Sequence, residues 1–299
     1  MKNRYQKYIH IFITTLTIFG TSCGNPQSNN QPITDDSEPD SLRFIKTNIE
    51  YLLPSPEEVI EIIFQNNIPY KPELILKNHT YNKVINSNYQ ALTLGMYIAD
   101  FSYAILYNDI NTCSKNLLII QKLSDKIGIG ETFKNQYYKR VQNNLSNMDS
   151  IHSIYTDISE NSFSKLASTG NAEWLSLIAM GASIETIYIG YNALKTVSVD
   201  TTLKPFFIEQ RMVFENFYQN YMVYNKHKKD LEKFNTDIEA FYSLFKLNIW
   251  LIVDKNKISK TKNDSILNVN YIVKTNQEYI DNLGKGICTL RNNLVELHY

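Results

Sequence analysis

The sequence predicts an all-α protein, built as a multi-helix antiparallel bundle or α/α array of about nine helices. Three observations support this prediction. The alternation of apolar and polar residues that is typical of strands is nearly absent from residues 42–299. Apolar residues recur instead at helical spacing. Capping residues, glycines and prolines divide the chain at intervals that suit helices of ordinary length.

Residues with strong capping or breaking preferences set the expected ends of these helices. Ser55 and Glu58 match a capping box, with Pro56 at the first helical position. Gly128 is typical of a helix end, and residues 255–263 form a charged loop. Helices are expected over residues 55–65, 81–107, 111–127, 131–144, 149–166, 171–195, 202–224, 228–253 and 265–297.

Two of the later helices carry clear apolar stripes. Aromatic residues recur at helical spacing over residues 206–221, and this stripe is interpreted as core. The helix over residues 228–253 has a heptad seam, which is typical of a helix packed along its length. The seam consists of Leu231, Phe234, Ile238, Phe241, Phe245 and Ile252.

The first 22 residues are interpreted as a signal peptide. Lys2, Arg4 and Lys7 form a basic start, and a short apolar run follows over residues 9–19. About eleven residues span only ~16 Å as a helix, which is too short to cross a bilayer. Small residues then precede Cys23, as at a bacterial lipoprotein cleavage site, so Cys23 is the expected lipidation site.

The cleavage site is also compatible with a second kind of processing. The residues after it predict a tether. Gly20 stands where lipoprotein sites usually carry Leu, so cleavage by an ordinary signal peptidase is the alternative. Gly24 after the cysteine favours anchoring to the outer membrane of the bacterial cell envelope. Residues 23–41 comprise the lipidated cysteine and a polar tether expected to be disordered, and residues 42–299 form a single all-helical domain.

Charge and cysteine content exclude several classes of protein. The chain has 30 basic and 30 acidic residues, and loss of the leader's three basic residues leaves a net charge of −3. No basic run predicts binding to nucleic acid, and none predicts binding to anionic lipid. Cys113 and Cys288 are too few for a disulfide framework. One bridge between them is an alternative to the expected pair of unpaired, buried thiols.

The helix over residues 81–107 is expected to be central. Its stretch LGMYIADFSYAILY, residues 94–107, is apolar on almost every face, which predicts a buried helix. Thr93, Tyr97 and Asp100 fall on one strip within about 60° of arc. Because a buried carboxylate is costly unless it is paired or hydrogen-bonded, Asp100 should have a partner.

An acid followed three positions later by tyrosine recurs along the chain. It occurs at Asp100 and Tyr103, at Glu185 and Tyr188, and a third time at residues 239–242. Chance and internal duplication both remain open as its origin. The second copy follows residues 180–183, which include the small Gly181, and small residues let two helices approach closely.

These acids allow two interpretations. In the functional one, the acids face a tyrosine-lined cavity, and they bind a small molecule or act as general acid and base. In the structural one, each acid accepts hydrogen bonds that stabilise the bundle, and this is the expected role. The candidate ligand-binding residues are Thr93, Tyr97, Asp100, Tyr103, Glu185 and Tyr188.

Motifs for other chemistry are lacking. The histidines outside the leader, at positions 79, 152, 227 and 298, are not spaced to bind a metal from one helix. Ser-x-x-Lys occurs at Ser162 and Ser243, but without the companion motifs of acylating serines. No catalytic residue, metal or cofactor is therefore expected.

Several segments resemble a family of bacterial all-helical envelope lipoproteins. They are SPEEVIEII at residues 55–63, PEL at 72–74, LGMYIADFSYA at 94–104 and SIETIY at 183–188. The third is similar to a block LGVYGADLSYA of that family, and the resemblance spans roughly residues 50–195. It implies an all-helical fold and an envelope location, but the family has no assigned activity and supplies no catalytic residue.

The sequence thus predicts a lipid-anchored helical envelope protein that is structural or binds a partner or ligand, and that is not an enzyme. The alternative is a small-molecule binder or enzyme that uses Asp100 and Glu185. The expected partners are the membrane, through the N-terminal lipid, and an envelope protein, but not nucleic acid. The oligomeric state is left open.

Overall fold

The computed structural model describes most of the chain from residue 63 onward. The described residues are 63, 66–77, 80–131, 139–141, 143–144, 147, 150–151, 153–154, 165–196, 202–248, 250–253, 259–260, 267–268, 271–274 and 277–296. The predicted signal peptide, Cys23, the tether and the capping box at Ser55 lie outside them. So do large parts of the helices predicted over residues 131–144 and 149–166.

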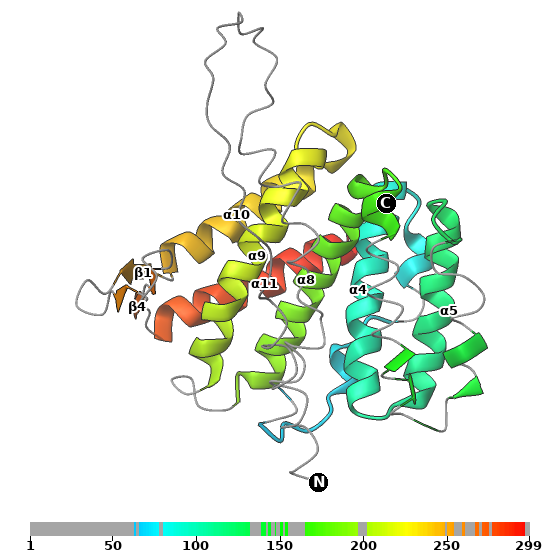
Figure 1. The fold of residues 1–299 in the computed structure, drawn as a ribbon, viewed down its shortest axis with the longest axis horizontal. Helices are drawn as coiled ribbons and strands as arrows, with labels where there is room; N and C mark the ends of the chain where they lie inside the picture. The colour runs from blue at the N-terminus through cyan, green and yellow to red at the C-terminus, as the bar shows by residue number, and fades with distance from the viewer. Residues whose placement is uncertain are drawn as a thin grey trace, which may run out of the picture. The chain divides into compact units, whose positions relative to one another are not determined.

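The all-α prediction is confirmed. Three short 3-10 helices accompany the α-helices: η2 (Pro72–Leu74), η3 (Thr80–Lys83) and η5 (Lys229–Leu231). The α-helices in the described part of the chain include α4 (Ser87–Leu106), α5 (Ile110–Lys126), α8 (Ala172–Leu194), α9 (Lys204–Asn225), α10 (Glu232–Asn248) and α11 (Gln277–Glu296). α4 packs between α5 and α8, and α8 also contacts α9 and α11 (Figure 1).

The expectation that residues near 250 and 270 are helical is wrong. β1 (Trp250–Val253) pairs antiparallel with β4 (Tyr271–Lys274), and β2 (Ser259–Lys260) pairs with β3 (Leu267–Asn268). α10 therefore ends at Asn248, before β1. The run Trp-Leu-Ile-Val has the aromatic and β-branched residues that strands prefer, and a short apolar run does not by periodicity alone distinguish a strand from a buried helix.

The predicted seam of α10 is confirmed except at its end. Leu231, in η5, and four α10 residues are buried, whereas Ile252 belongs to β1. Those four residues are Phe234, Ile238, Phe241 and Phe245. The aromatic stripe of α9 is core as expected, with Phe206, Phe207, Phe214, Phe217, Tyr218 and Tyr221 all buried.

α4 is the buried central helix that the sequence predicts. Asn86 caps it, since its Oδ1 accepts hydrogen bonds from the amides of Asn88 (2.8 Å) and Tyr89 (3.2 Å). Every residue from Tyr89 to Ile105 is buried. α4 therefore has no solvent-facing side over more than four turns, and its polar side chains must find partners inside the protein.

α4 and α8 meet backbone to backbone. A Cβ atom added at Gly95 would lie 1.9 Å from the carbonyl oxygen of Ile178, and one added at Gly181 would lie 1.9 Å from that of Leu92. This confirms the close approach expected from the small residues near Gly181. The helices run in the same direction, because Lys228 contacts the first turns of both helices.

The thiols of Cys113 and Cys288 are free. Cys113 is buried in α5, and burial raises its pKa to about 12. Cys288, on α11, is half-buried and accepts a hydrogen bond from Asn192. Unpaired thiols are thus confirmed, although Cys288 is less buried than expected. No helix among the described residues is long and apolar enough to cross a bilayer.

Gly95→Ala should destabilise the fold by at least about 3 kcal/mol, because the new methyl group meets backbone atoms that move only if α4 and α8 separate. Gly286→Ala, in α11, is the matched control. Its Cβ would meet side-chain atoms and not backbone, namely the end of Leu244 at 2.5 Å and the Phe241 ring at 3.1 Å, so the cost should be smaller, about 1–2 kcal/mol. Denaturant unfolding measures both, and equal costs would contradict the close contact.

Candidate functional site

The polar strip of α4 binds the backbone of residues 71–77, the segment that contains η2. The Tyr97 hydroxyl donates to the carbonyl of Lys77 (2.8 Å), and Asp100 Oδ2 accepts from the amide of Leu76 (2.9 Å). The Tyr103 hydroxyl accepts from the amide of Lys71 (3.1 Å). Three of the predicted ligand-binding residues therefore hold a neighbouring segment of the same chain.

Residues 71–77 need such partners because they have little regular structure. Outside η2, buried amides and carbonyls of this segment lack a helix or sheet ladder, and unpaired groups of this kind are costly. The segment also reaches α8, since Lys71 Nζ donates to the carbonyls of Asn192 (3.1 Å) and Ala193 (3.4 Å) in its last turn. It thus connects the C-terminal halves of α4 and α8, where an ammonium group complements the helix dipole.

Glu185 forms a buried, bidentate ion pair with Arg291 of α11. Arg291 Nε lies 3.0 Å from Glu185 Oε2, and Nη2 lies 2.9 Å from Oε1. The Glu185 side chain is fully buried and that of Arg291 is 12% exposed. The guanidinium also lies 4.4 Å from the centre of the Tyr188 ring, which is a cation–π contact. Glu185 and Tyr188 are thus joined through a residue that the sequence analysis missed.

Arg291 could have been found from its position in the last helix. The apolar face of α11 includes the buried residues Ile280, Ile287 and Leu294. Arg291 follows Ile287 by four residues and so falls on that same face. A basic residue in an apolar stripe predicts a buried acidic partner, but the sequence does not show which acid.

The positive charge near both Asp100 and Glu185 is that of the Arg291 guanidinium. Burial and the nearby Glu185 carboxylate raise the pKa of Asp100 well above its ordinary value of 3.8. Burial also raises the pKa of Glu185, and the Arg291 guanidinium opposes that rise. Because the bidentate geometry assigns the guanidinium to Glu185, the ionised form of Glu185 is the better stabilised of the two, and Asp100 is the acid that retains its proton to higher pH than an ordinary carboxyl group.

Two oxygens of the strip have no hydrogen-bond partner among the described residues. They are Asp100 Oδ1 and Thr93 Oγ1, and both are buried. Thr93 therefore differs from its three neighbours on the strip, which bond the 71–77 segment. The described residues also contain no group of three or more His, Cys, Asp or Glu side chains that could hold a metal ion.

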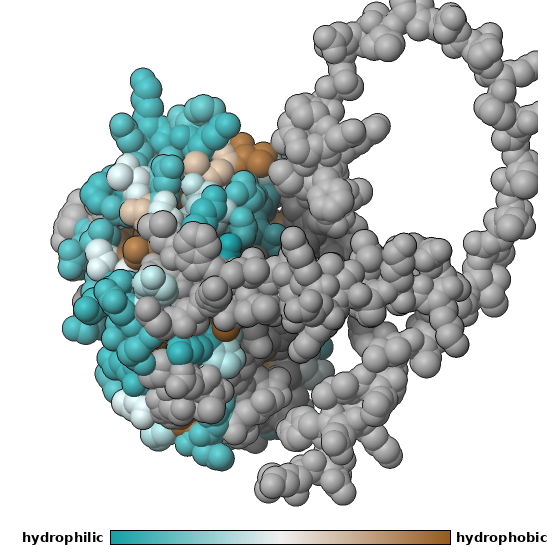
Figure 2. All heavy atoms as spheres, turned by 90° about the vertical axis from the view of Figure 1, so that its left-hand side faces the viewer, coloured by the Kyte–Doolittle hydropathy of each residue, from teal (hydrophilic) through white to brown (hydrophobic). Residues whose placement is uncertain are grey.

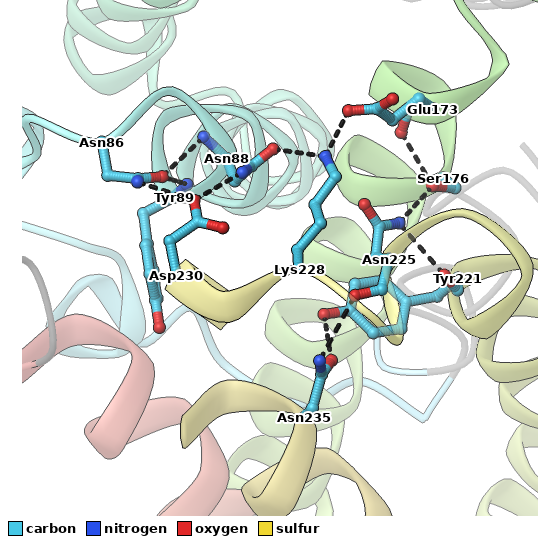
Figure 3. Close-up of polar contacts among 10 residues, drawn as sticks. All are labelled: Asn86, Asn88, Tyr89, Glu173, Ser176, Tyr221, Asn225, Lys228, Asp230 and Asn235. Carbon is cyan, nitrogen blue, oxygen red and sulfur yellow. Dashed lines mark hydrogen bonds and ion pairs between the residues drawn. The ribbon is translucent and has the colours of Figure 1, made fainter. Parts of the chain in front are cut away.

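A second polar cluster, which the sequence analysis missed, lies at the opposite ends of α4 and α8 (Figure 3). Lys228 extends between them, with its Nζ 2.7 Å from Asn88 Oδ1 and in contact with the Glu173 carboxylate. Asp230 Oδ2 accepts from Nδ2 of Asn86 (2.7 Å) and of Asn88 (2.6 Å). The connection from α9 to α10 thereby fastens the first turns of α4 and α8.

Comparisons with models of protein families, with curated proteins and with solved structures find no match to this chain. Functional proposals for this protein therefore rest on its own residues and contacts.

Asp100→Asn should remove a pH dependence of stability. Below pH 4 the carboxyl is protonated in both states. Above that pH the unfolded chain releases the proton and the folded protein retains it, so the free energy of unfolding falls by up to about 1.4 kcal/mol per pH unit. Asparagine does not titrate, so the variant should gain stability relative to wild type as the pH rises above the ordinary pKa of aspartate, near 4.

Denaturant unfolding across that pH range measures the effect. Asp100→Ala serves as the control, because it strands the Leu76 amide and should cost about 1–3 kcal/mol. Parallel curves for wild type and Asp100→Asn would contradict a protonated Asp100.

Glu185→Gln should destabilise the fold by about 3–5 kcal/mol, because it leaves the Arg291 guanidinium buried without its counter-charge. Adding Arg291→Met should recover most of that loss, since an apolar pair of similar size carries no buried charge. Thermal melts of the single and double variants test this coupling. A melting temperature raised by Glu185→Gln alone would show instead that the two acids strain the fold, as expected of a functional site.

Proposed function

We propose that this protein is a lipid-anchored component of a bacterial cell envelope whose helical domain has a structural or partner-binding role and no catalytic one. The observation that carries this proposal is the engagement of both candidate acids in contacts within the chain. Asp100 accepts from the Leu76 amide, and Glu185 is paired with Arg291. An acid–base pair needs at least one group that can reach a substrate, and both of these side chains are fully buried.

Anchoring is supported by the sequence at the start of the chain. A basic and then apolar leader over residues 1–22 ends in small residues before Cys23, and Gly24 favours the outer membrane. The resemblance to all-helical envelope lipoproteins points to the same location. About eighteen polar residues then separate Cys23 from the domain, which allows an end-to-end distance of roughly 21–25 Å.

A second function, binding of a small polar molecule, is favoured by one observation. Asp100 Oδ1 and Thr93 Oγ1 are buried on the same strip of α4 with no hydrogen-bond partner among the residues that the structure describes, and such buried oxygens suit a polar ligand. Native mass spectrometry of wild type and Asp100→Asn discriminates between the functions. A small molecule retained by wild type and lost from the variant would favour this second function.

Cys23→Ser should abolish labelling by a fatty-acid analogue in cells and move the protein from the membrane to the soluble envelope fraction. The far-UV spectrum and melting temperature of the domain should not change, because the residue lies before the tether. Cys113→Ser and Cys288→Ser, which alter thiols within the helical domain, are controls that should keep the label. Equal labelling of Cys23→Ser and wild type would overturn the anchor.

A further inference from the structure

The surface around α5 and η3 carries an excess of positive charge. Among the described residues from 77 to 131, two exposed side chains are acidic, those of Asp125 and Glu131. Five exposed side chains are basic: Lys77, Lys83, Lys115, Lys122 and Lys126. The domain as a whole, residues 42–299, has 27 basic and 26 acidic residues and is nearly neutral, so this surface is more positive than the domain average.

α5 arranges its lysines on one face. Lys115, Leu118, Lys122 and Lys126 fall within about 80° of arc at 100° per residue. Leu118 is 42% exposed between the lysines, whereas the large apolar residues on the other faces of α5 are mostly buried. A stripe that mixes lysine with one exposed apolar side chain has the composition of a helix that lies on a membrane surface.

Two of these lysines converge beside η3. The Nζ atoms of Lys122 and Lys126 lie 5.6 and 5.7 Å from the centre of the Tyr81 ring, and Lys122 donates to the Tyr81 hydroxyl (3.2 Å). Like charges four residues apart on a helix repel one another. The Tyr81 ring thus holds together two ammonium groups whose repulsion an external anion would relieve.

No carboxylate of the described residues neutralises this charge through an ion pair. Asp109 lies near Lys115, but its oxygens already accept hydrogen bonds from Thr112 and Tyr70. Ion pairs in the described part of the chain occur elsewhere, at Lys228, Lys233 and Arg291. The charge on this surface is therefore available to a partner.

We propose that the lysine face, formed by Tyr81, Lys83, Lys115, Leu118, Lys122 and Lys126, docks on an anionic phospholipid surface. The inference deepens the proposed function and rests on it for proximity, because a lipid anchor with a short tether keeps the domain near the headgroups. Lysine stems reach phosphates while their methylene groups lie along the boundary, and Leu118 inserts shallowly. Within the six residues of the lysine face, Leu118 is the one exposed aliphatic side chain, and so small an apolar area argues against a protein occupant.

Figure 2 shows the side of the domain that carries α10. There the described surface is mainly hydrophilic, with apolar atoms in small separate patches. The control lysines for the experiment, Lys226, Lys229 and Lys285, lie in the α9–α10 connection and in α11 and are exposed.

The test uses the chain from residue 23 onward with Cys23→Ser, which has neither leader nor acyl groups, so the result does not depend on the lipid anchor. Co-sedimentation at low salt should show binding to vesicles containing phosphatidylglycerol and none to pure phosphatidylcholine vesicles. Lys115→Gln/Lys122→Gln/Lys126→Gln should lower the partition coefficient roughly 100-fold, because each lysine near an anionic surface contributes about a factor of five. Lys226→Gln/Lys229→Gln/Lys285→Gln changes the net charge equally and should have little effect.

Three results would overturn the docking proposal. Equal binding to neutral and anionic vesicles would exclude an electrostatic role for the lysine face. Equal losses in the two triple variants would show that net charge matters and the face does not. Release by inorganic phosphate beyond that caused by chloride of the same ionic strength would identify a small-anion site instead. Loss of fatty-acid labelling bears only on the anchor, so the two proposals can fail separately.

Discussion

The backbone contact of α4 with α8 at Gly95 and Gly181 is the constraint on which the interior depends. No side chain lies between the two helices there. Their backbones approach so closely that a residue with a Cβ atom would clash. Because the helices run in the same direction, Asp100 and Glu185 are both buried between them. Arg291 is bound to Glu185, so burial and the Glu185 charge raise the pKa of Asp100.

The same geometry explains why a central helix carries a polar strip at all. Residues 71–77 cover α4 without forming a regular element beyond η2, and their backbone groups would be buried without partners. Tyr97, Asp100 and Tyr103 supply those partners. These side chains, which resemble the lining of a ligand site, therefore hold residues 71–77 against α4. Lys71 connects the same segment to α8.

Features set by local pattern were predictable, and features set by distant partners were not. The buried α4, the close approach at Gly181 and the α10 seam follow from composition and spacing within one helix. The strand β1 was missed because a short apolar run suits a strand or a buried helix equally. Arg291 was missed for another reason: its partner Glu185 is 106 residues away in sequence, and only packing brings the two together. The spacing of the α5 lysines could be read from the sequence, but the position of Tyr81 beside Lys122 and Lys126 could not.

Hydrogen exchange at the amides of Lys71 and Leu76 tests most directly whether Tyr103 and Asp100 hold residues 71–77. The account predicts slow exchange of both amides in the wild-type protein, although neither lies in a regular helix or strand. Asp100→Ala should speed exchange at Leu76 far more than at Lys71, which is held by Tyr103. Exchange of the wild-type Leu76 amide at the rate of an unstructured peptide would contradict the account, because Asp100 would then be free to serve a ligand.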